Sequence, residues 1–444
     1  MEIKQRMSTR FAWLLGVVAL VAMGVLVACG TTYDSSSDGL VLVGSQGSAA
    51  IQTFSFNLGS GHIGAIDNPT SSTSGQTCLL PGIPSSIVLD PAGAFAYAIV
   101  TKADACSGSA TGILAFKVNS GGTLTAAGSP IADPNPVALS MDSAGKFLFV
   151  AEGQSTVSIA NALTNSTPCV QTAAQNGVCV YAIGSAASLT PVALSFTLPS
   201  AIQSPNFAAL AATPTVLPKN GITGQNSVCS DVGNSPPTSE YLYLVDSVNN
   251  EIVEFSVETS TGALTIAGPL APVSTGSVPS GIAVDPCDRF VYAANNQSNN
   301  ISAYSICNGL ATQSTTLCPS VPDGRLVAIA GSPFPLSGGG ANEPRPIVVD
   351  PFGAALYVVG TGSGTVSIFG IAQVSGSLAP GNPATVATGS KPTSIAIRSD
   401  DSWLFVTNYD SQSLSQYSVT PSTGNLTPQT ATTTDNHPWG VAVK

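Results

Sequence analysis

Four ionisable side chains lie next to prolines that recur at one position of a repeated sequence element. Glu343 and Arg345 flank one such proline, while Lys391 and His437 directly precede two others. A histidine or a carboxylate can act as general base on water, and an arginine or lysine can stabilise a developing oxyanion. These residue types could therefore open a lactone ring, with Arg345 and Lys391 as anion clamps and His437 or Glu343 as the base. The alternative is an ordinary solvated surface.

Recurring aspartates are the next candidates, because a ring of carboxylates could hold a metal ion. Four of them lie in Asp-Pro-x-Gly or related turns, where the carboxylate accepts backbone hydrogen bonds: Asp90, Asp142, Asp285 and Asp350. His62 lies in a glycine-rich loop and is expected at the surface. The asparagine-rich hairpins lack the acidic spacing of a calcium loop, and no CxxC pair, zinc-protease motif, nucleophile elbow or phosphate loop occurs. The sequence therefore predicts no metal and no cofactor.

Charged residues make up 8% of the 444-residue chain, and the formal net charge is −11 at pH 7. An average soluble domain has about 25% charged residues. Small, β-branched and turn-forming residues replace them here, a mixture typical of many short strands. So few lysines and arginines cannot neutralise phosphates or anionic lipid, which argues against nucleic-acid binding and against electrostatic docking on membranes.

A pattern of two apolar patches separated by a polar turn recurs seven times. Its copies lie at 40–56, 95–118, 147–163, 241–257, 290–306, 355–371 and 403–419. A Pro-x-x-Ile-x-Val element precedes most copies, at 84–93, 136–145, 279–288, 344–353 and 392–401. Units of about 50 residues cannot bury their apolar faces alone, so they stack on their neighbours. The sequence predicts an all-β fold, a seven-bladed β-propeller of four-stranded antiparallel blades.

The two ends of the repeat region supply the closure of this ring. Residues 438–443 repeat the opening element with no blade after it, while the copy at 40–56 lacks an opening element. We therefore expect the C-terminal strand to complete the first blade and to cover both sheet edges. The propeller is predicted to span 40–444, with a long insertion at about 160–237. An eighth blade in that interval is the alternative.

Short motifs in the repeats carry a resemblance to a known family. Phe-Val-Thr-Asn at 405–408 and Tyr-Ala-Ala-Asn at 292–295 resemble the Tyr-Val-Thr-Asn core of a bacterial propeller repeat. Together with the opening element and Gly-x-Leu-Thr endings, they resemble the seven-bladed lactonase-like propellers, which include bacterial 6-phosphogluconolactonase. The resemblance implies lactone hydrolysis by an arginine and a histidine in a Gly-x-Gly-Pro-Arg-His motif. Here Arg345 is kept, Pro346 takes the place of that histidine, and another histidine precedes a proline at His437.

The N-terminus has the pattern of an export signal, with three basic residues before an apolar run at 11–27. The run ends in Leu-Val-Ala-Cys-Gly, which resembles a bacterial lipobox, so we expect residues 1–28 to be removed and Cys29 to be lipidated. An ordinary signal peptide or a membrane anchor is the alternative. Residues 29–39 are predicted to be a flexible tether. The protein is therefore expected in the bacterial cell envelope, lipid-anchored and extracytoplasmic, at the periplasmic or surface face of the outer membrane.

The eight cysteines other than Cys29 suit disulfide formation in an oxidising compartment. Two pairs would close short loops of about ten residues and are preferred for that reason: Cys169–Cys179 and Cys307–Cys318. The pairs that remain are Cys78–Cys106 and Cys229–Cys287.

Two hypotheses for the function follow. The first is a lipid-anchored binding module, a monomer that presents its faces to a protein, glycan or small-molecule ligand and touches the membrane only through its lipid. The second is a lactone hydrolase of the 6-phosphogluconolactonase type, with a site at the channel mouth. The hydrolase requires Arg345 and His437 to lie within reach of one substrate.

Overall fold

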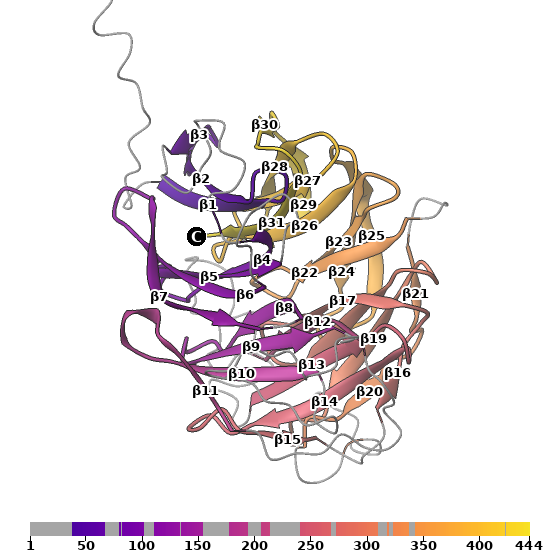
Figure 1. Cartoon of the computed structure of the whole chain (residues 1–444). Coiled ribbons are helices and arrows are strands. Elements are labelled where there is room, and N and C mark those ends of the chain that lie inside the picture. Colours follow the sequence, from indigo (N-terminus) through magenta and orange to yellow (C-terminus); the bar gives the residue numbers. More distant parts are fainter. Residues whose placement is uncertain are drawn as a thin grey trace, which may run out of the picture.

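The structure is a computed structural model, and it describes residues 38–66, 80, 82–101, 111–133, 135–153, 177–193, 206–213, 240–267, 272–309, 318, 323–336, 342–421 and 423–444. These residues form seven antiparallel sheets of four or five strands around a common axis (Figure 1). The predicted seven-bladed β-propeller is therefore confirmed. The single helical element in these ranges is the 3-10 turn η2 (Ser185–Ala187). None of the helical structure described could cross a membrane, being too short.

Each blade contributes one strand to a ring of inner strands that surrounds the axis. In ring order these are β31 (Pro438–Val443), β4 (Ile83–Leu89), β8 (Pro136–Met141), β12 (Phe207–Ala212), β17 (Pro279–Val284), β22 (Pro344–Val349) and β26 (Pro392–Ile397). Each inner strand packs against the inner strands of both neighbouring blades, so the ring is continuous (Figure 1). We number the blades 1 to 7 in this order.

The second and third strands of each blade form the polar hairpins that the repeats predict. The second strands are β1 (Asp38–Ser45), β5 (Phe95–Thr101), β9 (Phe147–Glu152), β13 (Glu240–Asp246), β18 (Phe290–Asn295), β23 (Ala355–Gly360) and β27 (Trp403–Asn408). The third strands are β2 (Ala50–Asn57), β6 (Gly112–Val118), β10 (Val178–Ile183), β14 (Glu251–Val257), β19 (Asn300–Ile306), β24 (Thr365–Ile371) and β28 (Ser413–Thr420). The second strands are the most buried in each blade, because both of their faces pack against neighbouring blades.

The outer strands are more exposed, and five of the seven are only three or four residues long, whereas β7 and β25 have nine and ten. They are β3 (Ile63–Ile66), β7 (Leu124–Ala132), β11 (Leu189–Pro191), β15 (Leu264–Ile266), β20 (Leu326–Ala328), β25 (Leu378–Ala387) and β29 (Asn425–Pro428). Three two-residue strands extend this edge in blades 4, 5 and 7: β16 (Val273–Ser274), β21 (Phe334–Pro335) and β30 (Thr432–Thr433).

Blade 1 combines the two ends of the propeller. Strand β31 pairs with β1 in antiparallel register, with Val443 opposite Val41 and Val441 opposite Val43. The backbone N–H of Lys444 donates to the carbonyl of Leu40 over 2.9 Å. The C-terminal strand is thus the inner strand of blade 1, which confirms the predicted closure.

Six of the seven second strands have an aromatic residue in the middle, which lies between adjacent blades; blade 1 has Leu42 there. Three tyrosines donate their hydroxyls over 2.8–2.9 Å to the carbonyl of a glycine in the next blade: Tyr243 to Gly324, Tyr292 to Gly376 and Tyr357 to Gly424. Each glycine precedes an outer strand and has a φ of 67–74°, which glycine adopts without strain. The Gly-x-Leu endings of the repeats are therefore explained by contacts between blades.

The recurring aspartates cap turns, as predicted. In blade 2, Asp90 Oδ1 accepts from the backbone N–H groups of Ala94 and Phe95 over 2.6 and 2.7 Å. Blade 3 repeats this arrangement at Asp142, and blades 5 and 6 have related turns. The carboxylates therefore stabilise the turn that connects the inner strand to the second strand.

Blades 6 and 7 meet at two buried carboxyl groups with incomplete hydrogen bonding. Asp401 occupies the left-handed turn position of blade 7, with a φ of 57°, and neither carboxylate oxygen has a partner in the described structure. Burial, followed by the charge of Asp350, raises the pKa of Asp401 to about 8. Burial also raises the pKa of Asp350 to about 6. Both groups are therefore more stable protonated in the folded chain than in the unfolded chain.

The raised pKa values of Asp350 and Asp401 predict that the free energy of unfolding decreases as the pH rises. An unfolded aspartate titrates near pH 4, so the contribution of Asp401 is fully present below that pH and is lost as pH rises through about 8. In chemical denaturation between pH 5 and 9, Asp401→Asn should reduce the pH dependence of the unfolding free energy by about 1–2 kcal/mol. Asp400→Asn is the control, because the pKa of Asp400 is lowered by hydrogen bonds from Arg398 and Ser402 that outweigh its burial. An unchanged slope in Asp401→Asn would contradict the prediction.

The third repeat differs from the sequence-based expectation. The second patch of the copy at 147–163 was expected to pair with the first, but β9 pairs with β10 at 178–183 instead. That expectation was wrong. It follows from the composition of residues 155–163, which are apolar and β-branched like a strand. Residues 154–176 lie outside the described residues. The interval 160–237 also contains β11 and the inner strand β12, so it completes blades 3 and 4, and no eighth sheet occurs in the described residues.

One predicted disulfide lies entirely within the described residues. Cys307 and Cys318 are bonded, as their spacing predicted. Cys179 and Cys287 are also disulfide-bonded, to cysteines outside the described residues. The pairings predicted for Cys78, Cys106, Cys169 and Cys229, and the lipidation of Cys29, likewise fall on residues outside the described ranges.

Candidate functional site

The inner strands all begin at one face of the propeller, which we call the opening face. The first residue of an inner strand pairs with the end of the second strand, as Pro392 does with Asn408. Because the blades are repeats arranged around one axis, these first residues share a face. All four predicted site residues lie there: Glu343, Lys391 and His437 directly precede β22, β26 and β31, and Arg345 is the second residue of β22.

A β-bulge lies near the start of every inner strand, after the first residue in six of them and after the second residue, Pro84, in β4. Bulges redirect side chains and are frequent beside active sites. The bulged positions hold Ser85, Val137, Ala208, Ser280, Arg345, Thr393 and Trp439. Arg345 and Trp439 are the two largest side chains of this set, and Arg345 is exposed. The bulges of blades 6 and 1 therefore present a cation and an aromatic ring at the opening face.

The residues before the inner strands have an unusual backbone conformation. Glu343, Lys391 and His437 have φ values of 45°, 53° and 57°, and Val278 in blade 5 has 53°. Positive φ is uncommon for residues with a side chain, and it is enriched at functional sites and switch regions. Glu343, Lys391 and His437 therefore occupy the same strained backbone position in three consecutive blades, 6, 7 and 1.

Lys391, Tyr409, His437 and Trp439 form an aromatic cluster at the junction of blades 7 and 1. The Lys391 Nζ atom lies 4.5 Å from the centre of the Tyr409 ring. The His437 ring stacks on Tyr409 with centroids 4.4 Å apart and planes inclined by 26°, and Trp439 meets Tyr409 edge-on at 5.6 Å. The backbone N–H of Tyr409 donates to the backbone carbonyl of Lys391 over 3.0 Å, which holds the two residues side by side. Cation–π and stacking contacts contribute about 0.5–1.5 kcal/mol each.

The structure separates the predicted site residues into groups. Lys391 and His437 contact the same tyrosine, whereas Arg345 belongs to blade 6, one blade away from Lys391 and two blades away from His437. Glu343 is exposed, and its backbone N–H donates to Asn299 Oδ1 of blade 5 over 3.2 Å. The cation that shares a ring contact with His437 is therefore Lys391.

Sequence reasoning missed Tyr409 and Trp439. Each has a recognisable signal, because Tyr409 directly follows the Phe-Val-Thr-Asn motif and Trp439 follows the last opening proline. Both were assigned to the repeat pattern and not considered as part of a site. The cluster depends on two blades meeting at the closure, which the order of residues along the chain does not reveal.

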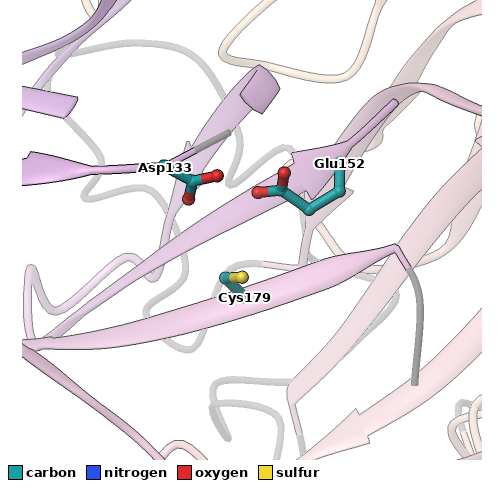
Figure 2. A group of neighbouring side chains, drawn as sticks. All are labelled: Asp133, Glu152 and Cys179. Carbon is teal, nitrogen blue, oxygen red and sulfur yellow. The ribbon is translucent and has the colours of Figure 1, made fainter. Parts of the chain in front are cut away.

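A second group of functional side chains lies in blade 3, where Asp133, Glu152 and Cys179 approach one another (Figure 2). Their ligand atoms lie within 4.8 Å of one another, and the two carboxylates point toward each other. Asp133 is 3% exposed and Glu152 is 9% exposed. The Tyr181 hydroxyl donates to Asp133 Oδ2 over 3.2 Å, while Asp133 Oδ1 and Glu152 Oε1 have no hydrogen-bond partner in the described structure.

Burial dominates the electrostatics of this group. Burial and then the neighbouring Asp133 carboxylate raise the pKa of Glu152 to about 10, and burial also raises the pKa of Asp133. One carboxyl group is therefore expected to be protonated at neutral pH. The sequence predicted no metal-binding group here, because the three residues come from separate segments with no motif spacing. Cys179 is disulfide-bonded, so its sulfur is not available as a thiolate ligand in this state.

The family model of lactonase, described as a seven-bladed β-propeller, matches residues 199–317 and 347–443. The seven sheets and the closure show the fold of a seven-bladed β-propeller, and over these two segments the chain is similar to the lactonase family of that fold. The resemblance inferred from the repeat motifs is thereby confirmed. No curated protein matches the sequence.

Solved structures of similar architecture include proteins named as lactonases. A putative 6-phosphogluconolactonase from Bacteroides fragilis is 18% identical with a TM-score of 0.62, and the match covers 93% of this chain and 99% of that one. A periplasmic gluconolactonase from Pseudomonas aeruginosa is 18% identical with a TM-score of 0.61, covering 92% and 99%. A protein from Lactobacillus plantarum is 14% identical with a TM-score of 0.63, covering 92% and 99%. At these identities the likeness shows the fold.

Proposed function

We propose that this protein binds and hydrolyses a sugar lactone at the opening face, where blades 7 and 1 meet. The observation that supports the proposal best is the aromatic cluster, in which Lys391 and His437 are held against one tyrosine ring. His437 and Lys391 both lie over the Tyr409 ring, so the half-buried Trp439 ring beside it is the aromatic surface offered to a sugar ring. The lactonase family match and the gluconolactonase neighbour support the same class of reaction.

The chemistry of ring opening assigns a role to each side chain. A water molecule must lose a proton as it attacks the lactone carbonyl, and His437 is the base in the cluster. The carbonyl oxygen then carries a negative charge, which Lys391 is placed to stabilise. Arg345, one blade away and exposed, is proposed to hold an anionic group on the far side of the same substrate. Glu343 is given no role in this scheme.

A binding module without hydrolysis is the second candidate. The observation that favours it is that Tyr409, with its cation and its edge-on tryptophan, already forms a surface for a polyhydroxylated or anionic ligand. In this version His437 positions the ring by stacking and transfers no proton.

We further propose that the protein works outside the cytoplasm, anchored in the bacterial cell envelope through a lipid on Cys29. The proposal rests on the sequence of the N-terminal segment and is supported by the Cys307–Cys318 disulfide. Disulfides persist in oxidising compartments and are rare in the cytosol. A soluble or small-molecule ligand would then reach the opening face from the periplasm or the medium.

Turnover of a panel of sugar and aliphatic lactones by the full-length protein tests the proposal. His437→Ala should lower kcat by about 10²–10⁴, the usual contribution of a general base. Lys391→Met should lower it by about 10²–10³. His62→Ala is the matched control, because His62 is the other histidine of the chain and is exposed on the opposite side of blade 1 from the inner strands.

The same experiment separates the two candidates. Turnover that survives in both His437→Ala and Lys391→Met would place catalysis elsewhere. A folded protein that binds a lactone without turnover, and whose binding is weakened by Lys391→Met, would overturn hydrolysis in favour of the binding module.

A further inference from the structure

Asp133, Glu152 and Cys179 lie at positions that blades 5 and 7 fill with neutral residues. Blade 4 has a carboxylate at the Glu152 position, Asp246, but it accepts hydrogen bonds from the backbone of the following turn. Glu152 ends its second strand opposite the first residue of the inner strand, as Asn408 does in blade 7. Cys179 lies opposite Val150 in the same way that Ser415 lies opposite Val406. The repeat therefore provides an internal comparison for what the fold requires at these positions.

In blade 7 the corresponding groups satisfy one another. Asn408 Nδ2 donates to Ser415 Oγ over 2.9 Å, and Asn408 Oδ1 accepts from the backbone N–H of Gly389 over 3.0 Å. Gly389 belongs to the segment that leads into the inner strand, as Asp133 does in blade 3. A neutral, hydrogen-bonded trio is therefore sufficient for the fold at this place.

Blade 5 has the same neutral residues, although Asn295 Oδ1 has no partner in the described structure. Asn295 Nδ2 donates to Ser302 Oγ over 3.0 Å, and the N–H of Gly276 donates to the same oxygen over 3.2 Å. Blade 3 replaces the asparagine by glutamate, the serine by cysteine, and adds an aspartate side chain. The Asp133 and Glu152 carboxyl groups form a hydrogen bond with each other, which offsets part of the cost of burying them. Asp133 Oδ1 and Glu152 Oε1 have no partner in the described structure, so each carboxyl group keeps one oxygen available to a ligand.

We propose that reduction of the Cys179 disulfide converts this group into a site for Zn²⁺ or a similar thiophilic divalent ion. Its ligands are the Cys179 thiolate and one carboxylate oxygen each from Asp133 and Glu152, whose mutual approach within 4.8 Å suits a single metal ion. Zinc accepts three protein ligands of mixed sulfur and oxygen type, with a water molecule in the fourth position. The Tyr181 hydroxyl, bonded to Asp133 Oδ2, holds that carboxylate in place.

The reaction balances with a dithiol reductant. Two electrons and two protons from the dithiol, which becomes a disulfide, cleave the Cys179 disulfide to two thiols. Zinc then displaces the thiol proton of Cys179 and the proton held between the two carboxyl groups, and both are released to solvent. In the oxidised protein the sulfur remains covalently bonded, so the site lacks its third ligand.

The amount of zinc that the protein retains tests the proposal directly. We would use the full-length protein carrying Cys307→Ser and Cys318→Ser, which removes the other described cysteine pair. After incubation with Zn²⁺ and dialysis, the phosphine-reduced protein should retain about one zinc per chain by atomic emission, and the oxidised protein almost none. With Co²⁺, the reduced protein alone should show thiolate-to-cobalt charge-transfer absorption in the near ultraviolet.

Glu152→Asn is the matched variant, because it installs the residue of blades 5 and 7 and leaves every cysteine in place. In the reduced state it should bind zinc at least tenfold more weakly than the parent. Circular dichroism checks its fold, and Asp133→Asn is a second variant of the same type should Glu152→Asn unfold. Equal zinc binding by the oxidised and reduced parent would overturn the redox dependence. Equal binding by the reduced parent and a folded variant would show that other thiols hold the metal, which overturns the site.

Discussion

A chain that ends at residue 437 is expected to lose the closed ring. Strand β31 supplies the whole inner strand of blade 1, and Val441 and Ala442 are buried in the cores on either side of it. The carbonyl of Trp439 also accepts hydrogen bonds from the hydroxyls of Thr393 and Thr407 in blade 7. Removing the strand exposes these apolar side chains and the edges of two blades.

We expect this deletion to lower the free energy of unfolding by at least about 5 kcal/mol, from the burial of several apolar side chains at about 1.5–3 kcal/mol each. The melting temperature of the full-length chain should fall by more than about 10 °C when residues 438–444 are removed. Differential scanning calorimetry of both chains measures the change. A melt within a few degrees of the intact protein would refute the role of the closure.

A permuted chain controls for the loss of residues as such. Residues 438–444, placed before residue 38 through a copy of the Asp90–Gly93 turn, would give blade 1 the connectivity of the other blades. This chain should regain most of the lost stability, because the same strand returns to the same sheet. Failure to recover would mean that the terminal residues act in some way other than as a strand.

Arg289→Met is expected to be the most damaging single substitution at an ion pair. Arg289 is 1% exposed and Asp285 is 0% exposed, and two hydrogen bonds of 2.8 and 2.9 Å join the guanidinium to the carboxylate. Arg289 Nη1 also donates to the carbonyl of Gln373 in blade 6 over 3.0 Å. Removal of the cation leaves the buried Asp285 carboxylate with only its backbone N–H partners, Cys287 and Arg289, which costs about 3–5 kcal/mol.

Thermal denaturation of Arg289→Met should therefore show a melting temperature about 10 °C lower. Arg325→Met is the control, because the Arg325–Asp323 pair is partly exposed and such pairs contribute about 0–1 kcal/mol. The double variant Asp285→Asn/Arg289→Met should recover part of the loss, since it removes the stranded charge. Equal losses for Arg289→Met and Arg325→Met would contradict a special role for the buried pair.

The fold could be predicted from the sequence because each blade repeats the same local chemistry. Asp-Pro-x-Gly turns, alternating apolar strands and the unpaired opening element at 438–443 determine the blade count and the closure together. The exception was blade 3, where a strand-like segment at 155–163 precedes the true third strand, β10. Periodicity within one repeat could not distinguish them, because the choice depends on which segment can reach β9.

The candidate sites could be predicted only in part. Positions next to the opening prolines were expected at one face because they recur at one point of the repeat. Their partners were not, because Tyr409 meets Lys391 and His437 only where the last blade joins the first. The blade 3 group lay beyond sequence reasoning for the same reason, since pairing between strands, and not spacing along the chain, brings Glu152 and Cys179 together.

Hydrogen bonds from a tyrosine hydroxyl to a glycine carbonyl join some neighbouring blades and not others, so the junctions of the ring differ in their contacts. From blade 4 to blade 7, each junction joins a hydroxyl of one repeat to a left-handed glycine of the next, so neither partner can be replaced without the other. The bond is missing at the other four junctions in the described structure: blades 1, 3 and 7 have Leu42, Phe149 and Phe405 at this position, and the Tyr97 hydroxyl of blade 2 has no partner. A duplication or loss of one repeat would be tolerated more readily at those four junctions. The polar bonds between blades are thus concentrated in the arc of blades 4 to 7, and the closure at blade 1 lies outside it.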